Sequence, residues 1–265
     1  MPDNRFENQT ALITGSSQGI GRGIALALAR EGADIVINYH SDDGPAERTA
    51  GEIRELGRKV LVVQADVGRR EEVRRMFEEA EVSFPRLDIV VANAAYSARG
   101  SVLEIEWEDV LRTLQVSQFG VFHTCQFAAR RMSAQEPISG SRGKIILISS
   151  ILAEVHPPGN AAYNMAKAAV NALGETLAAE LAGHRINVNT INPGLIDTPG
   201  ERKYASEEEL QAAASRIPWK RLGTIDDIGR AAAYLASSDA NYITGSTLRV
   251  DGGFLVGLEL PPADQ

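Results

Sequence analysis

Short apolar segments alternate with longer helical stretches along this chain, and this alternation constrains its fold more than any other feature. Several segments are continuous apolar runs, as is typical of parallel strands buried on both faces. The expected strands are Ala11–Thr14, Ile35–Asn38, Val60–Gln64, Ile89–Ala92, Lys144–Ile148, Asn187–Ile191 and Thr247–Val250. The expected helices are Gly21–Arg30, Ala46–Leu56, Glu71–Ser83, Trp107–Met132, Ala161–Leu181 and Asp226–Ala236. The pattern predicts an α/β fold with a doubly wound parallel sheet of about seven strands and helices on both faces.

A chain of 265 residues without a long linker is expected to form a single domain over residues 1–265. The segment from Pro199 to Pro218 departs from the alternation. It is polar, contains three consecutive glutamates, and follows Pro193-Gly194. We expect a mobile lid at about residues 195–218 that carries a short helix, with an exposed insertion as the alternative.

A glycine-rich turn, Thr14-Gly15-Ser16-Ser17-Gln18-Gly19-Ile20-Gly21, joins the first expected strand to the first expected helix. Glycines let the backbone approach a pyrophosphate, and a helix N-terminus favours negative charge. The spacing differs from the common G-x-G-x-x-G, and a purely structural turn would have a similar composition. Taken alone, the turn leaves both interpretations open.

Tyr163 and Lys167 are four residues apart, so on a helix they share one face. A phenol with a pKa near ~10 is a poor base at neutral pH, and a nearby ammonium favours the phenolate. Ser150 can donate a hydrogen bond to a substrate oxygen. These three side chains could therefore move a proton on and off an alcohol or carbonyl.

The candidate motifs all follow expected strands. The glycine turn, Asp66, Asn93, Ser149-Ser150 and Pro193-Gly194 each come after one. A doubly wound sheet binds its ligands at the carboxyl ends of its strands. Widely separated segments are thus predicted to meet in one crevice.

In this order, the motifs resemble the classical type of the short-chain dehydrogenase/reductase family, from Thr10 to about Gly253. Asn93-Ala94-Ala95 is similar to the family's Asn-Asn-Ala-Gly turn, although Ala92 and Ala95 replace the usual first Asn and the Gly. Asp251-Gly252-Gly253 matches a late family motif. The resemblance implies a Rossmann-type fold and an NAD(P)-dependent oxidoreductase that acts on CH–OH groups.

The resemblance also implies roles for individual residues. Tyr163 would exchange the substrate proton, Lys167 would favour the phenolate and hold the nicotinamide ribose, and Ser150 would orient the substrate oxygen. The implied cofactor-binding residues are Gly15, Ser17, Gln18, Gly19, Ile20, Gly21, Tyr39, His40, Ser41, Asp66, Val67, Asn93, Ala94, Tyr163, Lys167, Pro193, Gly194, Ile196 and Thr198. No metal site is expected.

Ser117 departs from the family pattern. Val116 to Phe122 aligns with a segment in which an Asn normally links the lysine to solvent through water. Ser117 stands at that position, and a serine can hold a water with less reach. We therefore expect Ser117 to act in the catalytic relay, with a rewired relay or lower activity as the alternatives.

The cofactor preference depends on the end of the second strand. The acidic residue that binds a ribose 2′-hydroxyl in NAD enzymes is expected there. Tyr39 occupies that position, and Asp42 and Asp43 follow too late. His40 and Ser41 could contact a 2′-phosphate. We expect NADP to be preferred, and the use of NAD stays open.

The substrate is suggested by resemblance to the glucose 1-dehydrogenase group, which implies a sugar or polyol. Tyr96, Glu154 and His156 are the expected pocket residues. A 3-oxoacyl-(acyl-carrier-protein) reductase is one alternative. A non-catalytic nicotinamide-binding sensor is another, favoured by Ser117 and the altered Asn-Ala-Ala turn.

Composition excludes several other classes. A net charge of −8 argues against nucleic acid as the main partner. The chain has no apolar run near the ~20 residues of a membrane span and no secretory pattern, so a cytoplasmic enzyme is expected. The single cysteine, Cys125, is expected in the core.

Family resemblance implies a homotetramer with contacts through the helices Trp107–Met132 and Ala161–Leu181 and the apolar run Phe254–Leu258.

Overall fold

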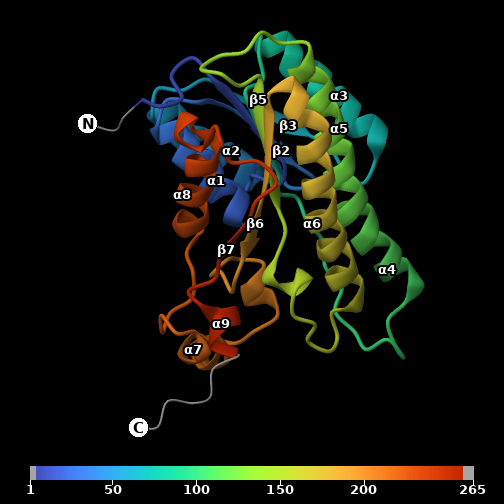
Figure 1. The fold of residues 1–265 in the computed structure, drawn as a ribbon. Helices are drawn as coiled ribbons and strands as arrows, with labels where there is room; N and C mark the ends of the chain where they lie inside the picture. The colour runs from blue at the N-terminus through green and yellow to red at the C-terminus, as the bar shows by residue number, and fades with distance from the viewer. Residues whose placement is uncertain (1–3, 259–265) are drawn as a thin grey trace.

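The computed structural model describes residues 4–258, which form a central sheet of seven parallel strands (Figure 1). The strands are β1 (Thr10–Ile13), β2 (Asp34–Tyr39), β3 (Val60–Gln64), β4 (Ile89–Ala92), β5 (Gly143–Ile148), β6 (Ile186–Pro193) and β7 (Thr247–Val250). Their order is β3-β2-β1-β4-β5-β6-β7, and every neighbouring pair is parallel. The predicted doubly wound sheet is confirmed. The direction of winding reverses between β1 and β4, which is where such folds bind ligands.

Helices cover both faces of the sheet (Figure 1). One layer contains α1 (Gly19–Arg30), α2 (Asp43–Glu55) and α8 (Ile225–Ala236), and the other contains α3 (Arg70–Ser83), α4 (Trp107–Leu114), α5 (Gly120–Ser133) and α6 (Ala161–Leu181). No helix within residues 4–258 has the length and apolar character needed to cross a bilayer.

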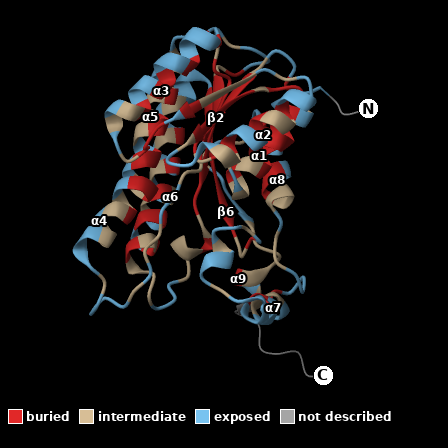
Figure 2. Ribbon diagram, turned by 180° about the vertical axis from the view of Figure 1, so that it is seen from behind, coloured by how far each residue is buried: buried red, intermediate tan, exposed pale blue. Residues whose placement is uncertain are grey.

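The core lies in two layers, one on each side of the sheet. Along β1, Ala11 and Ile13 pack with α1 and α8, whereas Leu12 packs with α3, α5 and α6. Figure 2 shows the buried residues concentrated in the strands and on the inner sides of the helices. Because alternate side chains enter opposite layers, both sets must be apolar, which explains the continuous apolar runs.

The predicted helix Trp107–Met132 differs from the observed structure. Between α4 and α5, residues Gln115–Phe119 form a π-helical turn. The next residue, Gly120, packs so closely on the loop after β3 that a Cβ there would lie 2.6 Å from Val67 Cγ2. The sequence predicted one continuous helix because the apolar face continues through this π-helical turn, and hydrophobic periodicity does not detect a single widened turn.

Other helix boundaries also differ from the prediction. α2 begins at Asp43 rather than Ala46, because the Asp42 side chain accepts a hydrogen bond from the Gly44 amide at 3.0 Å and caps the helix. The apolar run at the end of the described chain forms a short helix, α9 (Phe254–Leu258).

The lid segment contains a short helix, as predicted. This helix, α7 (Glu207–Arg216), begins with a reciprocal capping box between Ser206 and Glu209. In Figure 1, α7 and α9 lie together beyond the carboxyl ends of the strands.

Candidate active site

The glycine turn after β1 is held in shape by two asparagines from neighbouring strands. Asn93 Nδ2 donates to the carbonyls of Thr14 at 2.8 Å and Gly15 at 3.2 Å. A Cβ on Gly21 would lie 2.6 Å from the same nitrogen, so the packing requires glycine. Asn38, on β2, accepts a hydrogen bond from the Gly15 amide at 3.0 Å. Asn38 was not among the predicted site residues, although a buried polar residue in an apolar strand was the available signal.

The amino end of α1 fits a diphosphate. Its first turn contains no acidic residue, and the preceding Gln18 side chain does not cap it. Gly15 and Gly19 have φ angles of +63° and +58°, a region that glycine enters at little cost. Amides left free at the positive end of a helix dipole bind phosphate oxygens. The residues present therefore match the diphosphate of a nicotinamide dinucleotide.

The segment after β6 extends from the sheet to this turn. The Gly194 amide donates to the Val250 carbonyl at 3.0 Å, which fixes the beginning of the segment to β7. Ile196 is buried in the core layer that includes α1. A Cβ on Gly19 would lie 3.8 Å from Thr198 Cβ, so Thr198 lies beside the glycine turn.

Asp66 follows β3 and lies close to His40. Its carboxylate accepts hydrogen bonds from Arg112 at 2.8 Å and from the Gly68 amide at 2.9 Å. Burial alone would raise the pKa of Asp66, but these hydrogen bonds lower it. His40 Nε2 is 3.9 Å from the same carboxylate. The structure therefore brings the two predicted residues, Asp66 and His40, together. It adds Arg112, which belongs to no motif recognised in the sequence.

Tyr163 and Lys167 lie on successive turns of α6, beside the end of β5. Lys167 is 1% exposed, and its Nζ donates to the Ile148 carbonyl at 2.7 Å. The same Nζ lies 5.4 Å from the centre of the Tyr163 ring. Burial lowers the pKa of Lys167 to about 7. Ser149 Oγ donates to the Lys167 carbonyl at 2.9 Å, so α6 is attached to β5 at two points.

The surroundings of Tyr163 keep its phenol protonated. Burial raises the pKa of Tyr163, the charge of Glu201 raises it further, and the charge of Arg99 partly opposes this. Ser150 Oγ accepts a hydrogen bond from the Leu152 amide at 3.1 Å, which leaves its own hydrogen for another acceptor. Tyr163 thus needs additional positive charge nearby to act as a base.

Ser117 lies in the π-helical turn and is fully buried. Its Oγ donates to the Tyr96 carbonyl at 2.6 Å and accepts from the Tyr96 amide at 2.9 Å. The hydroxyl therefore uses its only hydrogen, and one of its two acceptor positions, on the backbone of one residue. In the structure, Ser117 anchors the loop that follows β4.

The three predicted pocket residues differ in their surroundings. Tyr96 and His156 are exposed. The Glu154 carboxylate instead accepts from Asn192 Nδ2 at 2.9 Å and forms an ion pair with Arg249, whose Nε is 3.0 Å from Glu154 Oε1. The hydrogen bond from Arg249 lowers the pKa of Glu154. Glu154 thus links the loop after β5 to β6 and β7.

The segment predicted to be a lid, residues 195–218, also contacts the loop after β4. Arg99 pairs with Glu201, and the Tyr204 hydroxyl donates to the Ser97 carbonyl at 3.4 Å. Glu201 and Tyr204 lie in the predicted lid, which was expected to border the pocket. Ser97 and Arg99 were not predicted as part of the site, because the sequence does not show which loop the lid meets.

A cavity of about 300 Å³ lies between the lid, α8 and the end of β7. Its walls include Trp219, Asp227 and Arg249. Of the predicted cofactor-binding residues only Ile196 lines it, and Tyr163 and Lys167 do not. This cavity is therefore separate from the candidate proton-transfer residues Tyr163 and Lys167.

Comparisons with known proteins agree with this geometry. The family profile described as Enoyl-(Acyl carrier protein) reductase matches residues 15–255. Glucose 1-dehydrogenase 2 of Bacillus subtilis is 35% identical over 246 residues, which cover 92% of this chain and 94% of that protein. A 3-oxoacyl-(acyl-carrier-protein) reductase of Staphylococcus epidermidis is 37% identical over 249 residues, which cover 93% and 98%.

The fold comparison agrees as well. A short-chain type dehydrogenase/reductase from Mycobacterium marinum matches with a TM-score of 0.86 at 33% identity, and the match covers 95% of this chain and 97% of that one. The chain therefore belongs to the short-chain dehydrogenase/reductase family, whose members are oxidoreductases of alcohol and carbonyl groups.

Proposed function

We propose that this enzyme transfers a hydride between NADP or NAD and a secondary alcohol or carbonyl group, and that its substrate is a sugar or polyol. One observation carries the proposal. The buried Lys167 ammonium lies beside the Tyr163 ring, at the carboxyl end of the strand that leads into Ser150.

The side chains of the protein move the proton. In oxidation, the Tyr163 phenolate takes the substrate hydroxyl proton as a hydride leaves the adjacent carbon, and in reduction the phenol returns a proton to the carbonyl oxygen. Protonated Lys167 offsets the effect of burial on Tyr163 by opposite charge. Ser150 donates a hydrogen bond to the substrate oxygen and orients it. The nicotinamide ring, when bound, accepts or supplies the hydride.

We also propose that NADP is the preferred cofactor. β2 ends at Tyr39 rather than at an acidic residue. The Asp42 side chain caps α2, so its carboxylate is used within the protein. His40 and Ser41 are exposed directly after β2, where a 2′-phosphate would lie. The test is the ratio of kcat/KM for NADP to that for NAD. His40→Asp should lower this ratio, and an unchanged ratio would argue against the assignment.

The similarity to glucose 1-dehydrogenase 2 supports a sugar substrate, and the similarity to a 3-oxoacyl-(acyl-carrier-protein) reductase supports a second candidate. A screen that follows the absorbance of reduced nicotinamide separates them. It should include aldoses, polyols and 3-oxoacyl thioesters with both cofactors. A sugar or polyol should give the highest kcat/KM. A thioester that exceeds every sugar would favour the second candidate, and cofactor binding without turnover would favour a nicotinamide sensor.

A further inference from the structure

A small polar pocket lies at the amino ends of the strands, on the opposite side of the sheet from the carboxyl ends that carry the proposed active site. It has a volume of about 60 Å³ and is lined by residues near the amino ends of β1, β4 and β5, together with the turn after α8. A water molecule occupies about 30 Å³ in the liquid, so the pocket has room for a small ion. Lys144, on β5, is about 17 Å from Ser149 at the rise of a parallel strand.

Lys144 is the buried cation of this pocket. The residue is 6% exposed, and its Nζ donates to Asn241 Oδ1 at 2.6 Å. An ammonium has three N–H donors, so this contact uses one of them. Within residues 4–258 Lys144 forms no ion pair, and burial lowers its pKa to about 8. A buried ammonium without a counter-charge is costly, and a well-placed anion would offset part of that cost.

Arg142 adds a second cation. Its Nε donates to the Gln135 carbonyl at 2.7 Å and its Nη1 to the His184 carbonyl at 3.1 Å. In the described part of the chain, Arg142 has no carboxylate partner within ion-pair distance. The third cation in the wall, Arg5, is already paired with two carboxylates, Glu31 and Asp239.

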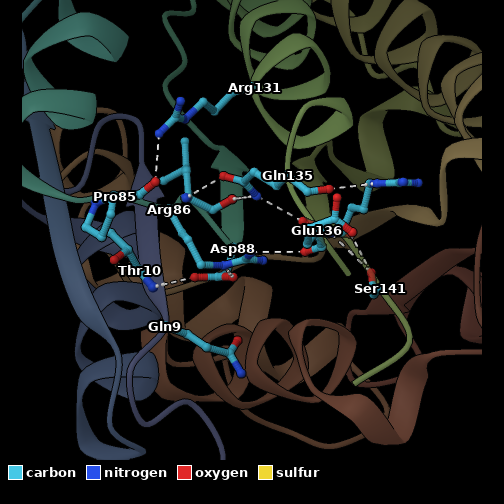
Figure 3. Close-up of polar contacts among 12 residues, drawn as sticks. Gln9, Thr10, Pro85, Arg86, Asp88, Arg131, Gln135, Glu136 and Ser141 are labelled. Carbon is cyan, nitrogen blue, oxygen red and sulfur yellow. Dashed lines mark hydrogen bonds and ion pairs between the residues drawn. The ribbon is translucent and has the colours of Figure 1, made fainter. Parts of the chain in front are cut away.

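The carboxylate in the wall, Asp88, is also already paired. One oxygen of Asp88 accepts from Arg86 Nε at 2.8 Å, and the other accepts from the Thr10 amide at 3.0 Å. Figure 3 shows Asp88 between these partners, with Gln135 bonded to the backbone on the other side. Within residues 4–258 Asp88 therefore forms an ion pair with Arg86 and none with Lys144.

We propose that this pocket binds a small oxyanion of the chemistry of inorganic phosphate, with Lys144 and Arg142 as its charged ligands. Two cations without carboxylate partners then face one anion, in a protein whose net charge is −8. The site lies away from Tyr163 and Lys167, so the anion acts on stability and leaves proton transfer unchanged.

The test is thermal unfolding during a titration with inorganic phosphate, against sodium chloride at matched ionic strength. Reduced nicotinamide cofactor is present throughout, so that phosphate does not act at the glycine turn. Phosphate should raise Tm in a saturable manner, since a ligand that binds the folded state stabilises it. Acetate in a parallel titration shows whether a carboxylate can replace phosphate.

Lys144→Met keeps the aliphatic stem and removes the charge, and it should abolish the saturable shift. Lys59→Met is the matched control, because Lys59 is exposed just before β3 at the same edge of the sheet. Arg142→Gln should weaken phosphate binding at least ten-fold, and it serves as the second variant if Lys144→Met fails to fold. A Tm shift that follows ionic strength alone, that persists in folded Lys144→Met, or that needs no more phosphate in Arg142→Gln than in the wild type would overturn the proposal.

Discussion

Arg99 Nη2 lies 3.1 Å from Glu201 Oε1, and this ion pair joins the loop after β4 to the lid. The Arg99 guanidinium also lies 4.5 Å from the centre of the Tyr204 ring, which belongs to the same lid. Both charges act on Tyr163, the proposed proton-transfer residue, because Glu201 raises its pKa and Arg99 lowers it. The contact that holds the lid is therefore also part of the electrostatics of the site.

Neutral variants of this pair should shift the pH dependence in opposite directions. In the proposed mechanism oxidation requires the Tyr163 phenolate, so the oxidation rate should rise with pH through the pKa of Tyr163. Glu201→Gln removes a charge that raises this pKa and should move the rise to lower pH. Arg99→Gln should move it to higher pH. The measurement is kcat against pH for both variants, and shifts in the same direction would contradict the assignment.

The same two variants should loosen the lid to a similar extent. A partly exposed ion pair contributes about 0.2–1 kcal/mol, so KM should rise by a factor of about 1.4 to 5 in each. Arg230→Gln is the control, since it breaks an exposed ion pair with Asp226 on α8. A KM that changes equally in the control would show that the effect is not specific to the lid.

Tyr163→Phe should lower kcat by roughly 10²–10⁴-fold or more, because it removes the group that exchanges the substrate proton. Cofactor affinity, measured by fluorescence titration, should stay nearly unchanged. Tyr242→Phe, at an exposed tyrosine outside the site, is the control. Turnover near the wild-type value in Tyr163→Phe would refute the mechanism.

Ser117 allows two roles to be separated. Its hydroxyl is engaged by the Tyr96 backbone, so we expect Ser117→Ala to displace the loop and to raise KM more than it lowers kcat. A role in a water relay, as the sequence alignment suggests, would instead lower kcat and change its pH dependence. In that case Ser117→Asn should keep or raise activity. If none of these parameters changes, Ser117 serves helix packing alone.

We predict a homotetramer in solution. Large apolar side chains are exposed on α4, on α6 and in the turn that leads to α5, including Trp107, Phe119 and Met165. Exposed apolar patches of this kind usually mark contacts between subunits. Light scattering should give four times the 28.5 kDa mass of the chain. Phe119→Asp should reduce this mass, whereas Val82→Asp, at an exposed position on α3, should not. A stable monomer at micromolar concentration would refute the prediction.

The other predicted contact, the run from Phe254 to Leu258, forms α9. Within it Leu255 is buried and Val256 is exposed, and the side chain of Leu258 lies outside the described residues. Its burial against another subunit stays a prediction.

Cys125 should be unreactive in the folded protein. It is 1% exposed in the core layer that contains α5, and burial raises its pKa to about 12. The thiolate, which is the reactive form, is therefore scarce at neutral pH. A thiol reagent such as Ellman's reagent should react only after unfolding in guanidinium. Rapid reaction in native buffer would show that the core opens around Cys125.

The sequence by itself determined the sheet and the candidate proton-transfer residues. Apolar runs predict buried parallel strands because both faces of each strand are covered. Tyr163 and Lys167 share a face because four residues make about one helical turn. The glycine turn was visible because glycine alone tolerates both a positive φ, as at Gly15, and backbone packing too close for a Cβ, as at Gly21. These properties are local, so they can be seen in one stretch of chain.

Only the tertiary structure decided which side chains meet across the fold. Residues from different elements meet at the widened turn that contains Ser117, in the bonds from Glu154 to Asn192 and Arg249, and in the ion pair of Arg99 with Glu201. The burial of Lys144 with Asn241 as its side-chain hydrogen-bond partner likewise depends on how the neighbouring strands and turns pack around it. Periodicity fixes which face of an element is apolar, but it carries no information on the register of one element against another. Contacts between polar groups depend on that register at the scale of a single hydrogen bond, and packing sets it only when the whole chain has folded.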